Sequence, residues 1–264
     1  MSTLQNKIIK RIKSNILQLS HKAKSSHIGG CLSIVDILVV LFNSILRKKS
    51  GKKFKDSFIL SKGHACLALY CILFEKGILS KKTLLSYGEN NTLLMSHASH
   101  HVPGIKFSTG SLGHGLPVAI GSALSAKKDK NDRKVYVLIS DGELNEGTTW
   151  EALMFAAHHK LNNLCVIIDY NKLQSLTFVS ETIKIEPLAQ KIISFGCEVK
   201  NINGHNILQL KKALKLKNKN KPRVIIANTI KGKGISFMEN NIVWHYKSPN
   251  ARELKKALKE VNNA

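Results

Sequence analysis

The sequence predicts an α/β protein of the doubly wound type, with a mostly parallel sheet and helices on both of its faces. Two observations lead to this prediction. Strand-like apolar runs alternate with helix-like segments along the chain. In addition, the segment 134–175 holds two apolar runs with a helical pattern between them, as in two parallel neighbouring strands of a buried sheet. Ligands of such sheets bind at the carboxyl ends of the strands.

The first half of the chain carries mainly helical patterns. Residues 4–20 place apolar side chains at helical spacing among Lys and Arg, which is typical of an amphipathic helix. Ser33 and Asp36 resemble a capping box in front of an apolar helix over 34–45. The other elements that we expect are a basic, exposed linker at 47–56, a strand at 57–60, a helix to about residue 76, a short helix from residue 80, an irregular segment at 88–115 and a helix at 116–127.

The second half alternates between strands and helices. The expected strands are 135–139, 164–168, 198–202 and 224–229, and the expected helices are 148–161, 186–195, 206–216 and 251–261. A second irregular segment covers 231–249, and irregular segments of this length inside a compact domain are usually functional or disordered. No repeat and no Pro/Ser-rich linker divides the chain, so we expect a single domain over residues 1–264.

The charge of the chain is unusual. Lys and Arg number 41 and Asp and Glu 17, which gives a formal net charge of +24. The basic residues are spread out, with small clusters at 47–55, 127–134 and 211–221, and no nucleic-acid motif accompanies them. Solvated lysine faces are therefore the favoured interpretation, an acidic partner chain comes second, and nucleic acid comes third.

Other features of the composition concern the cellular setting. No run approaches the roughly 20 apolar residues of a membrane span, and no cleavable signal follows the basic N-terminus, so we expect a cytoplasmic protein. The cysteines are odd in number, lack CxxC spacing and stand mostly among apolar neighbours. This pattern favours buried free thiols over disulfides or a zinc site.

Polar residues follow the two strands of the central segment where each strand ends. Asp141 and Asn171 should therefore converge at one edge of the sheet. Carboxylate and amide oxygens suit Mg²⁺, which often takes its remaining ligands from phosphates. Gly142 leaves room for the backbone to approach a bulky anion. The same residues also fit ordinary turn and loop chemistry, so these two interpretations stay open at this point.

Several further motifs occur in a fixed order. They are Ser26–Gly30, Ser61–Ala65, His97 before Pro103–Gly104, Thr109–Gly115, Ser140–Gly147 with Asn171, and Lys231–Gly234 followed by Trp244-His245. Their order and spacing resemble the thiamine-diphosphate-binding half of transketolase over about residues 5–250. The resemblance is greatest to the short amino-terminal subunit of transketolases that are split into two chains.

The resemblance implies a metal and diphosphate site. Asp141, Asn171 and the backbone carbonyl of Leu173 would hold Mg²⁺, and Gly142 and Glu143 would lie against the diphosphate of thiamine diphosphate. Members of the family usually begin the first motif with Gly-Asp-Gly, whereas Ser140 stands first here, which should fit if its φ is negative. The segment after Asn171 also differs, because relatives often carry Asp-Gly near this point.

The resemblance also implies roles near the reacting groups. The residues expected near the cofactor's pyrimidine and thiazolium rings are Gly110, Ser111 and Leu112. His64 and His245 would line the space between diphosphate and substrate, and His27 and His97 would hydrogen-bond the oxygens of a ketose. Glu146 would lie at a subunit interface and couple to carboxylates of the opposing site. Neutral imidazole both donates and accepts, which suits recognition of hydroxyl and carbonyl groups.

No motif singles out the histidines at six positions, namely His21, His100, His101, His158, His159 and His205. A zinc site at the loop of His97, His100 and His101 lacks a Cys or acidic ligand at a usual spacing. Within the cofactor class, a 2-oxo-acid dehydrogenase subunit would share the metal site, but the histidine set favours a sugar. 1-Deoxyxylulose-5-phosphate synthase is similar in motif but is normally one long chain.

The function that the resemblance implies is transfer of a two-carbon ketol unit from a ketose to an aldose, or between their phosphates. Transketolases need a second domain that binds the aminopyrimidine and supplies an activating glutamate. The chain has no room for it, so we expect a separate carboxyl-terminal subunit, in an α₂β₂ assembly, and neither nucleic acid nor membrane as a partner. The alternative is a cofactor-holding interaction subunit, or a degenerate binding protein, in a specialised sugar pathway.

Overall fold

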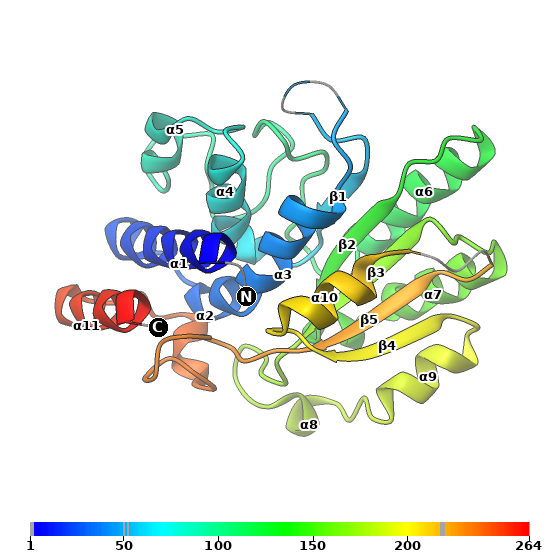
Figure 1. Ribbon diagram of the computed structural model, residues 1–264. Coiled ribbons are helices and arrows are strands. Elements are labelled where there is room, and N and C mark those ends of the chain that lie inside the picture. Colours follow the sequence, from blue (N-terminus) through cyan, green and yellow to red (C-terminus); the bar gives the residue numbers. More distant parts are fainter. Residues whose placement is uncertain (1–2, 50, 52, 217–219, 264) are drawn as a thin grey trace.

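The computed structural model describes residues 3–49, 51, 53–216 and 220–263, and within them it forms a five-stranded sheet of order β1-β2-β3-β5-β4 (Figure 1). The strands are Ser57–Leu60 (β1), Val135–Ser140 (β2), Leu164–Tyr170 (β3), Glu198–Asn203 (β4) and Arg223–Asn228 (β5). Each neighbouring pair is parallel, so the predicted parallel α/β fold is confirmed.

Helices connect the strands and cover both faces of the sheet. They are Thr3–Ala23 (α1), Ile28–Ser33 (α2), Val35–Val40 (α3), Cys66–Glu75 (α4), Lys81–Leu85 (α5), Gly115–Lys128 (α6), Gly147–His158 (α7), Val179–Thr182 (α8), Leu188–Ser194 (α9), Ile207–Leu214 (α10) and Ala251–Asn263 (α11). Helix α3 continues into a π-helical turn at Leu41–Ile45, and short 3₁₀ turns occur at Gly63–Ala65, Gly142–Asn145 and Ile242–His245.

Two apolar cores form because side chains alternate along the strands. Tyr136 and Leu138 of β2 belong to the core that includes side chains of α1, α3, α4, α10 and α11, whereas Val137 and Ile139 belong to the core that includes side chains of α6, α7 and α9. Strands β2 and β3 are buried along their whole length, which explains why they read as continuous apolar runs. Strand β4 lies at the edge, and its Lys200 and Asn201 are exposed.

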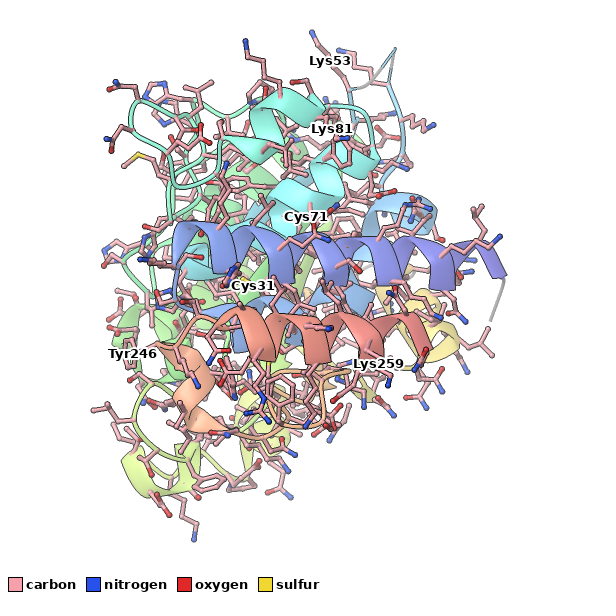
Figure 2. All side chains as sticks on the ribbon, turned by 90° about the vertical axis from the view of Figure 1, so that its left-hand side faces the viewer. Cys31, Lys53, Cys71, Lys81, Tyr246 and Lys259 are labelled. Carbon is pink, nitrogen blue, oxygen red and sulfur yellow. The ribbon has the colours of Figure 1, made fainter. Side chains whose placement is uncertain are left out.

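The first and last long helices lie side by side on the outside of one layer (Figures 1 and 2). Lys10 of α1 donates to the carbonyl of Asn262 in α11. All five cysteines are free and buried, as the sequence predicts, and two of them, Cys31 and Cys71, are labelled near α1 in Figure 2. Among the described helices, none is both long and apolar enough to span a bilayer.

The capping box predicted at Ser33 and Asp36 is wrong. Ser33 ends α2, and its hydroxyl donates to Asp169 Oδ2 at 2.7 Å and also lies 3.0 Å from the carbonyl oxygen of Gly30. Helix α3 follows Ile34 with no side-chain cap, and Asp36 Oδ2 is bound by His205. The hydroxyl is bound to the buried carboxylate of Asp169 in β3, and this long-range hydrogen bond takes the place of a local helix cap.

The predicted basic clusters are partly anchored. Arg47, in the segment expected to be an exposed linker, binds both Asp56 and Asp132. Lys55 also pairs with Asp132. The cluster at 211–221 includes residues 217–219, which lie outside the described residues.

Candidate active site

A cavity of about 260 Å³ lies at the carboxyl ends of β1, β2 and β3. The predicted site residues that line it are His27, His64, Leu112, Asp141, Gly142, Glu146, Asn171, Leu173 and His245. The predicted site residues that do not line it are His97, Gly110, Ser111 and Glu143. The structure therefore brings together residues of five motifs that are far apart in the sequence.

The oxygen-rich end of the cavity is formed by the loops after β2 and β3. Asp141 accepts hydrogen bonds from the backbone N–H of Gly142 at 2.9 Å and of Lys172 at 2.7 Å. The side-chain oxygen of Asn171 accepts from the N–H of Leu173 at 3.1 Å. Burial, together with the nearby Asp169, raises the pKa of Asp141 to about 7, so a bound cation would stabilise its charged form.

Lys172 lies between the two expected metal ligands of this loop and has a φ of 65°. A lysine in the left-handed region is uncommon and locally strained. Ser140, at the end of β2, does not have a positive φ. A serine can therefore stand where members of the family usually have glycine.

The side chain of Glu143, a residue predicted to lie against the diphosphate, is turned away from the cavity. Its carboxylate is fully buried and accepts from the hydroxyl of Ser61 at 2.5 Å and from the backbone N–H of Ser140 and Gly113. Glu143 therefore ties the ends of β1 and β2 to the glycine-rich segment.

The glycine-rich segment approaches the turn after β1 very closely. A Cβ atom on Gly63 would lie 2.3 Å from the carbonyl oxygen of Thr109, so only glycine fits this contact. The hydroxyl of Thr109 in turn donates to the carbonyl of Leu60 at 2.6 Å. This contact places the 109–115 segment beside His64.

Three histidine rings meet in the cavity. The ring of His27 lies 5.0 Å from those of both His64 and His245, measured between centroids. Burial lowers the pKa of His27 to about 4 and that of His245 to about 3, and neighbouring positive charges add to both shifts. Burial also holds the pKa of His64 well below its ordinary value. The three imidazoles are therefore neutral at neutral pH.

His97 is exposed outside the cavity lining, although its ring centroid lies 6.3 Å from that of His27. A Cβ on Gly110 would lie 3.3 Å from the ring of His97. Ser111 is exposed in the same segment. These residues therefore form the rim rather than the wall.

Two buried lysines and a buried aspartate were not singled out from the sequence. Lys62 donates to Asp169 Oδ2 at 2.6 Å, and their side chains are 2% and 0% exposed. Lys231 donates to the carbonyls of Leu173 at 3.1 Å and Gln174 at 2.8 Å, and its Nζ lies 2.9 Å from His245 Nδ1. Both lysines line the cavity. Each lies inside a motif of the sequence, and its position next to a glycine of that motif was the only indication of a functional role.

The donor set fits a diphosphate carried on Mg²⁺. Asp141, Asn171 and the carbonyl of Leu173 offer hard oxygen ligands, and Lys62 and Lys231 offer positive charge on the same cavity. The amide nitrogen of Gln174 is buried without a hydrogen-bond partner, and Gln174 also lines the cavity. Among the described residues, no cluster of three His, Cys, Asp or Glu side chains could hold a metal ion, so a metal here depends on amide and carbonyl oxygens.

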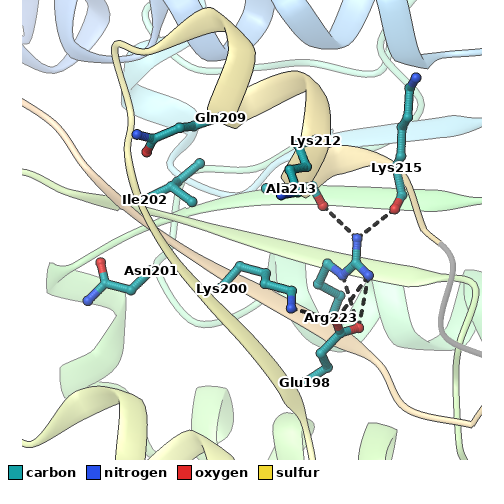
Figure 3. Close-up of a pocket in the computed structure, with 9 residues that line it drawn as sticks. All are labelled: Glu198, Lys200, Asn201, Ile202, Gln209, Lys212, Ala213, Lys215 and Arg223. Atoms are coloured by element: carbon teal, nitrogen blue, oxygen red, sulfur yellow. Dashed lines mark hydrogen bonds and ion pairs between the residues drawn. The ribbon is translucent and has the colours of Figure 1, made fainter.

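A larger cavity of about 780 Å³ lies between β4 and α10 (Figure 3). Its most buried polar group, Arg223, donates to the carbonyls of Ala213 and Lys215 and pairs with Glu198. Among the described residues, Arg223, Glu198 and these two carbonyls therefore satisfy one another. We place the functional site in the smaller cavity.

Comparison with known proteins identifies the family of the chain. The transketolase family model described as the thiamine diphosphate binding domain matches residues 4–261. An apulose-4-phosphate transketolase subunit of Phocaeicola vulgatus is 39% identical over 256 residues, which cover 95% of this chain and 91% of that protein. The 6-deoxy-6-sulfo-D-fructose transketolase subunit of Clostridium sp. is 37% identical and covers 89% of this chain and 87% of its own length.

One-chain transketolases match over less of their length. The crystal structure of transketolase from Campylobacter jejuni superimposes with a TM-score of 0.88 at 31% identity, over 98% of this chain and 42% of that one. Human transketolase is 36% identical over 90% of this chain and 38% of its own length. This chain therefore corresponds to less than half of a one-chain transketolase.

Proposed function

This chain belongs to the transketolase family, and from that premise we propose that it is the amino-terminal, thiamine-diphosphate-binding subunit of a two-chain transketolase. Its reaction is transfer of a two-carbon ketol unit between sugars or sugar phosphates. The observation that carries the proposal is one cavity that joins an oxygen-rich end, two buried lysines and three neutral histidines.

In the proposed site, Asp141, Asn171 and the carbonyl of Leu173 hold Mg²⁺. Lys231 is well placed to neutralise the diphosphate, because its Nζ already lies between the carbonyl of Leu173 and the ring of His245. Gly142 adds room beside them, since no atom lies within 3.8 Å of the place where its Cβ would be. The cofactor, when bound, supplies the carbon nucleophile that the protein lacks.

The histidines orient the sugar in this proposal. His27, His64 and His245 are neutral and can each donate one hydrogen bond and accept another. His97, at the rim, is placed to reach the far end of a ketose that enters past His27. Gly110, Ser111 and Leu112 would lie along the cofactor's rings, with Leu112 closest to the cavity.

A partner subunit would complete the site. Large apolar residues near the cavity are exposed to solvent: Leu176, Val243 and Tyr246 expose 79%, 58% and 59% of their surface. Leu176 follows Ser175 in the lining, and Tyr246 packs against His245 with ring centroids 4.8 Å apart. We propose that the whole chain is a single domain, that a carboxyl-terminal subunit covers this mouth in an α₂β₂ assembly, and that the exposed Glu146 lies at an interface.

The metal site is tested with Asp141→Ala and isothermal titration with thiamine diphosphate and Mg²⁺. Removal of the only carboxylate ligand should weaken cofactor binding by about 100-fold or more. Asp129→Ala, at an exposed aspartate after α6, is the matched control and should bind like the wild type. Equal binding by Asp141→Ala and wild type would refute the proposed ligand set.

The assembly is tested by native mass spectrometry of the protein from its own cells, with cofactor and Mg²⁺ present. The proposal expects a heterotetramer that carries two cofactor molecules. A homodimer or monomer without cofactor would instead favour a degenerate binding protein.

A further inference from the structure

His205 lies outside the cavity, in the turn between β4 and α10, yet both of its ring nitrogens are engaged. Its Nδ1 lies 2.7 Å from Asp36 Oδ2, and its Nε2 accepts the backbone N–H of Ile230 at 2.9 Å. An amide N–H can only donate, so Nε2 must carry no proton. The remaining ring proton is then on Nδ1, where it is donated to Asp36.

The residue that His205 holds is directly followed by the lysine of the cavity. Strand β5 ends at Asn228, and Ile230 begins the irregular segment that carries Lys231 and His245. Lys231 reaches the carbonyls of Leu173 and Gln174 and the ring of His245. Two consecutive hydrogen bonds therefore connect Asp36, His205 and Ile230. They fix the backbone directly before Lys231, whose side chain enters the cavity.

We propose that His205, oriented by Asp36, is a positioning residue that holds the Lys231 segment in place and releases it when Nε2 becomes protonated. A protonated Nε2 donates and cannot accept, so the bond to Ile230 is lost. The positioning rests on the geometry alone. Its consequence for cofactor binding rests on the function proposed above.

Charged groups from several elements face His205. Asp36 on α3 favours the protonated ring, and Lys13 on α1 and Lys233 in the irregular segment oppose it. Glu239 pairs with Lys233 and reduces its effect, and Lys10 of α1 lines the same cavity as His205. This cavity of about 220 Å³ adjoins His205, Asp36 and the three lysines, which gives protons from solvent a route to the ring.

Trp244 offers a local reporter that does not depend on the cofactor. It is buried in the same segment, next to His245, and its indole N–H donates to the carbonyl of Phe237 at 3.0 Å. In a Trp150→Phe background, Trp244 is the remaining tryptophan of the chain. The pKa values of His27 and His245, about 4 and about 3, keep these nearby rings from titrating above about pH 5.

The experiment follows Trp244 emission from about pH 8 to about pH 5 in the full chain. We expect a reversible change in the parent protein and its loss in His205→Gln, because a glutamine carbonyl can still accept from Ile230 but does not titrate. His158→Gln, at an exposed histidine of α7, is the control and should keep the change. If His205→Gln shows the same transition as the parent, the proposal is overturned.

A second readout is the affinity for thiamine diphosphate with Mg²⁺. His205→Leu should bind about tenfold more weakly at about pH 8, whereas His205→Gln should bind like the parent and lose less affinity at about pH 6. Unchanged affinity in His205→Leu would also overturn the proposal. If the parent protein binds no cofactor even together with its partner subunit, the proposed function fails, and the Trp244 measurement still decides whether His205 holds the segment.

Discussion

Four side chains donate hydrogen bonds to the buried carboxylate of Asp169. Besides the 2.6 Å contact from Lys62, its carboxylate accepts from the hydroxyls of Ser33 and Thr229 and from the amide of Asn171. Burial alone would raise the pKa of Asp169, but these donors hold it below its ordinary value. The carboxylate therefore stays charged in the interior, and it holds the side chain of Asn171 by accepting a hydrogen bond from its amide.

Breaking this pair should be costly. Lys62→Met leaves a buried carboxylate without its cation, and we expect it to lower the free energy of unfolding by about 3–5 kcal/mol in urea titrations. The double change Lys62→Met with Asp169→Leu should cost less than the two single changes added together, since no charge is left unpaired. Lys22→Met breaks the exposed pair with Glu89 and should have little effect. Additive single and double losses would contradict the interpretation.

The sequence could not reveal which lysines form this interior. Lys and Arg together number 41, and composition favours solvated faces for all of them. The histidines were easier to predict, because a ring next to glycine in an ordered motif is conspicuous. Lys62 became recognisable only when the parallel sheet placed the end of β1 close to the end of β3, two strands away.

At the scale of elements, the turn after β1 and the glycine-rich segment support each other. The contact of Gly63 with Thr109 and the bonds of Glu143 to Ser61 and Gly113 join the turn, the segment and the loop after β2. Gly113 has a φ of 80° and packs against Glu146. A shift in the turn would thus reach both sides of the cavity.

Gly63→Ala tests this coupling. The added methyl would overlap the backbone of Thr109, which cannot move aside like a flexible side chain, so we expect a loss of stability of about 2 kcal/mol or more. Gly121→Ala is the matched control, because no atom lies within 4 Å of its Cβ position in α6, and it should be neutral or stabilising by up to about 1 kcal/mol. Thermal denaturation of both variants gives the comparison. Equal melting temperatures would argue against a tight contact at Gly63.

Elements with a clear apolar pattern along their own residues could be predicted from the sequence. Features that depend on contacts with residues far away in the sequence could not. The buried strands β2 and β3 and the amphipathic helix α1 follow from their own residues, because burial on both faces or on one stripe leaves a pattern. The false capping box at Ser33 and the inward turn of Glu143 depend on contacts with Asp169 and with Ser61 and Gly113. A local motif cannot show that a long-range partner will use its side chain.

For the whole molecule, the neutral histidines make stability depend on pH. The ordinary pKa of His64 is 6.5, and burial with the nearby Lys62 lowers it well below that value in the folded chain. Between these values an unfolded chain binds a proton at this site and the folded chain does not, so unfolding is favoured. His27 and His245 act in the same direction, with folded pKa values of about 4 and about 3.

We therefore expect these histidines to leave the free energy of unfolding constant above about pH 6.5 and to lower it as the pH decreases toward about 4. The midpoint of urea unfolding, measured across this range, should show the decline. His64→Gln removes one of the titrating rings and should flatten the acid limb, whatever its effect on stability at neutral pH, whereas the exposed His158→Gln should leave the slope unchanged. An acid limb as steep in His64→Gln as in the parent would show that His64 takes up its proton at the same pH in the folded and the unfolded chain. The fold would then not keep this ring neutral below about pH 6.5, as the proposed sugar recognition expects.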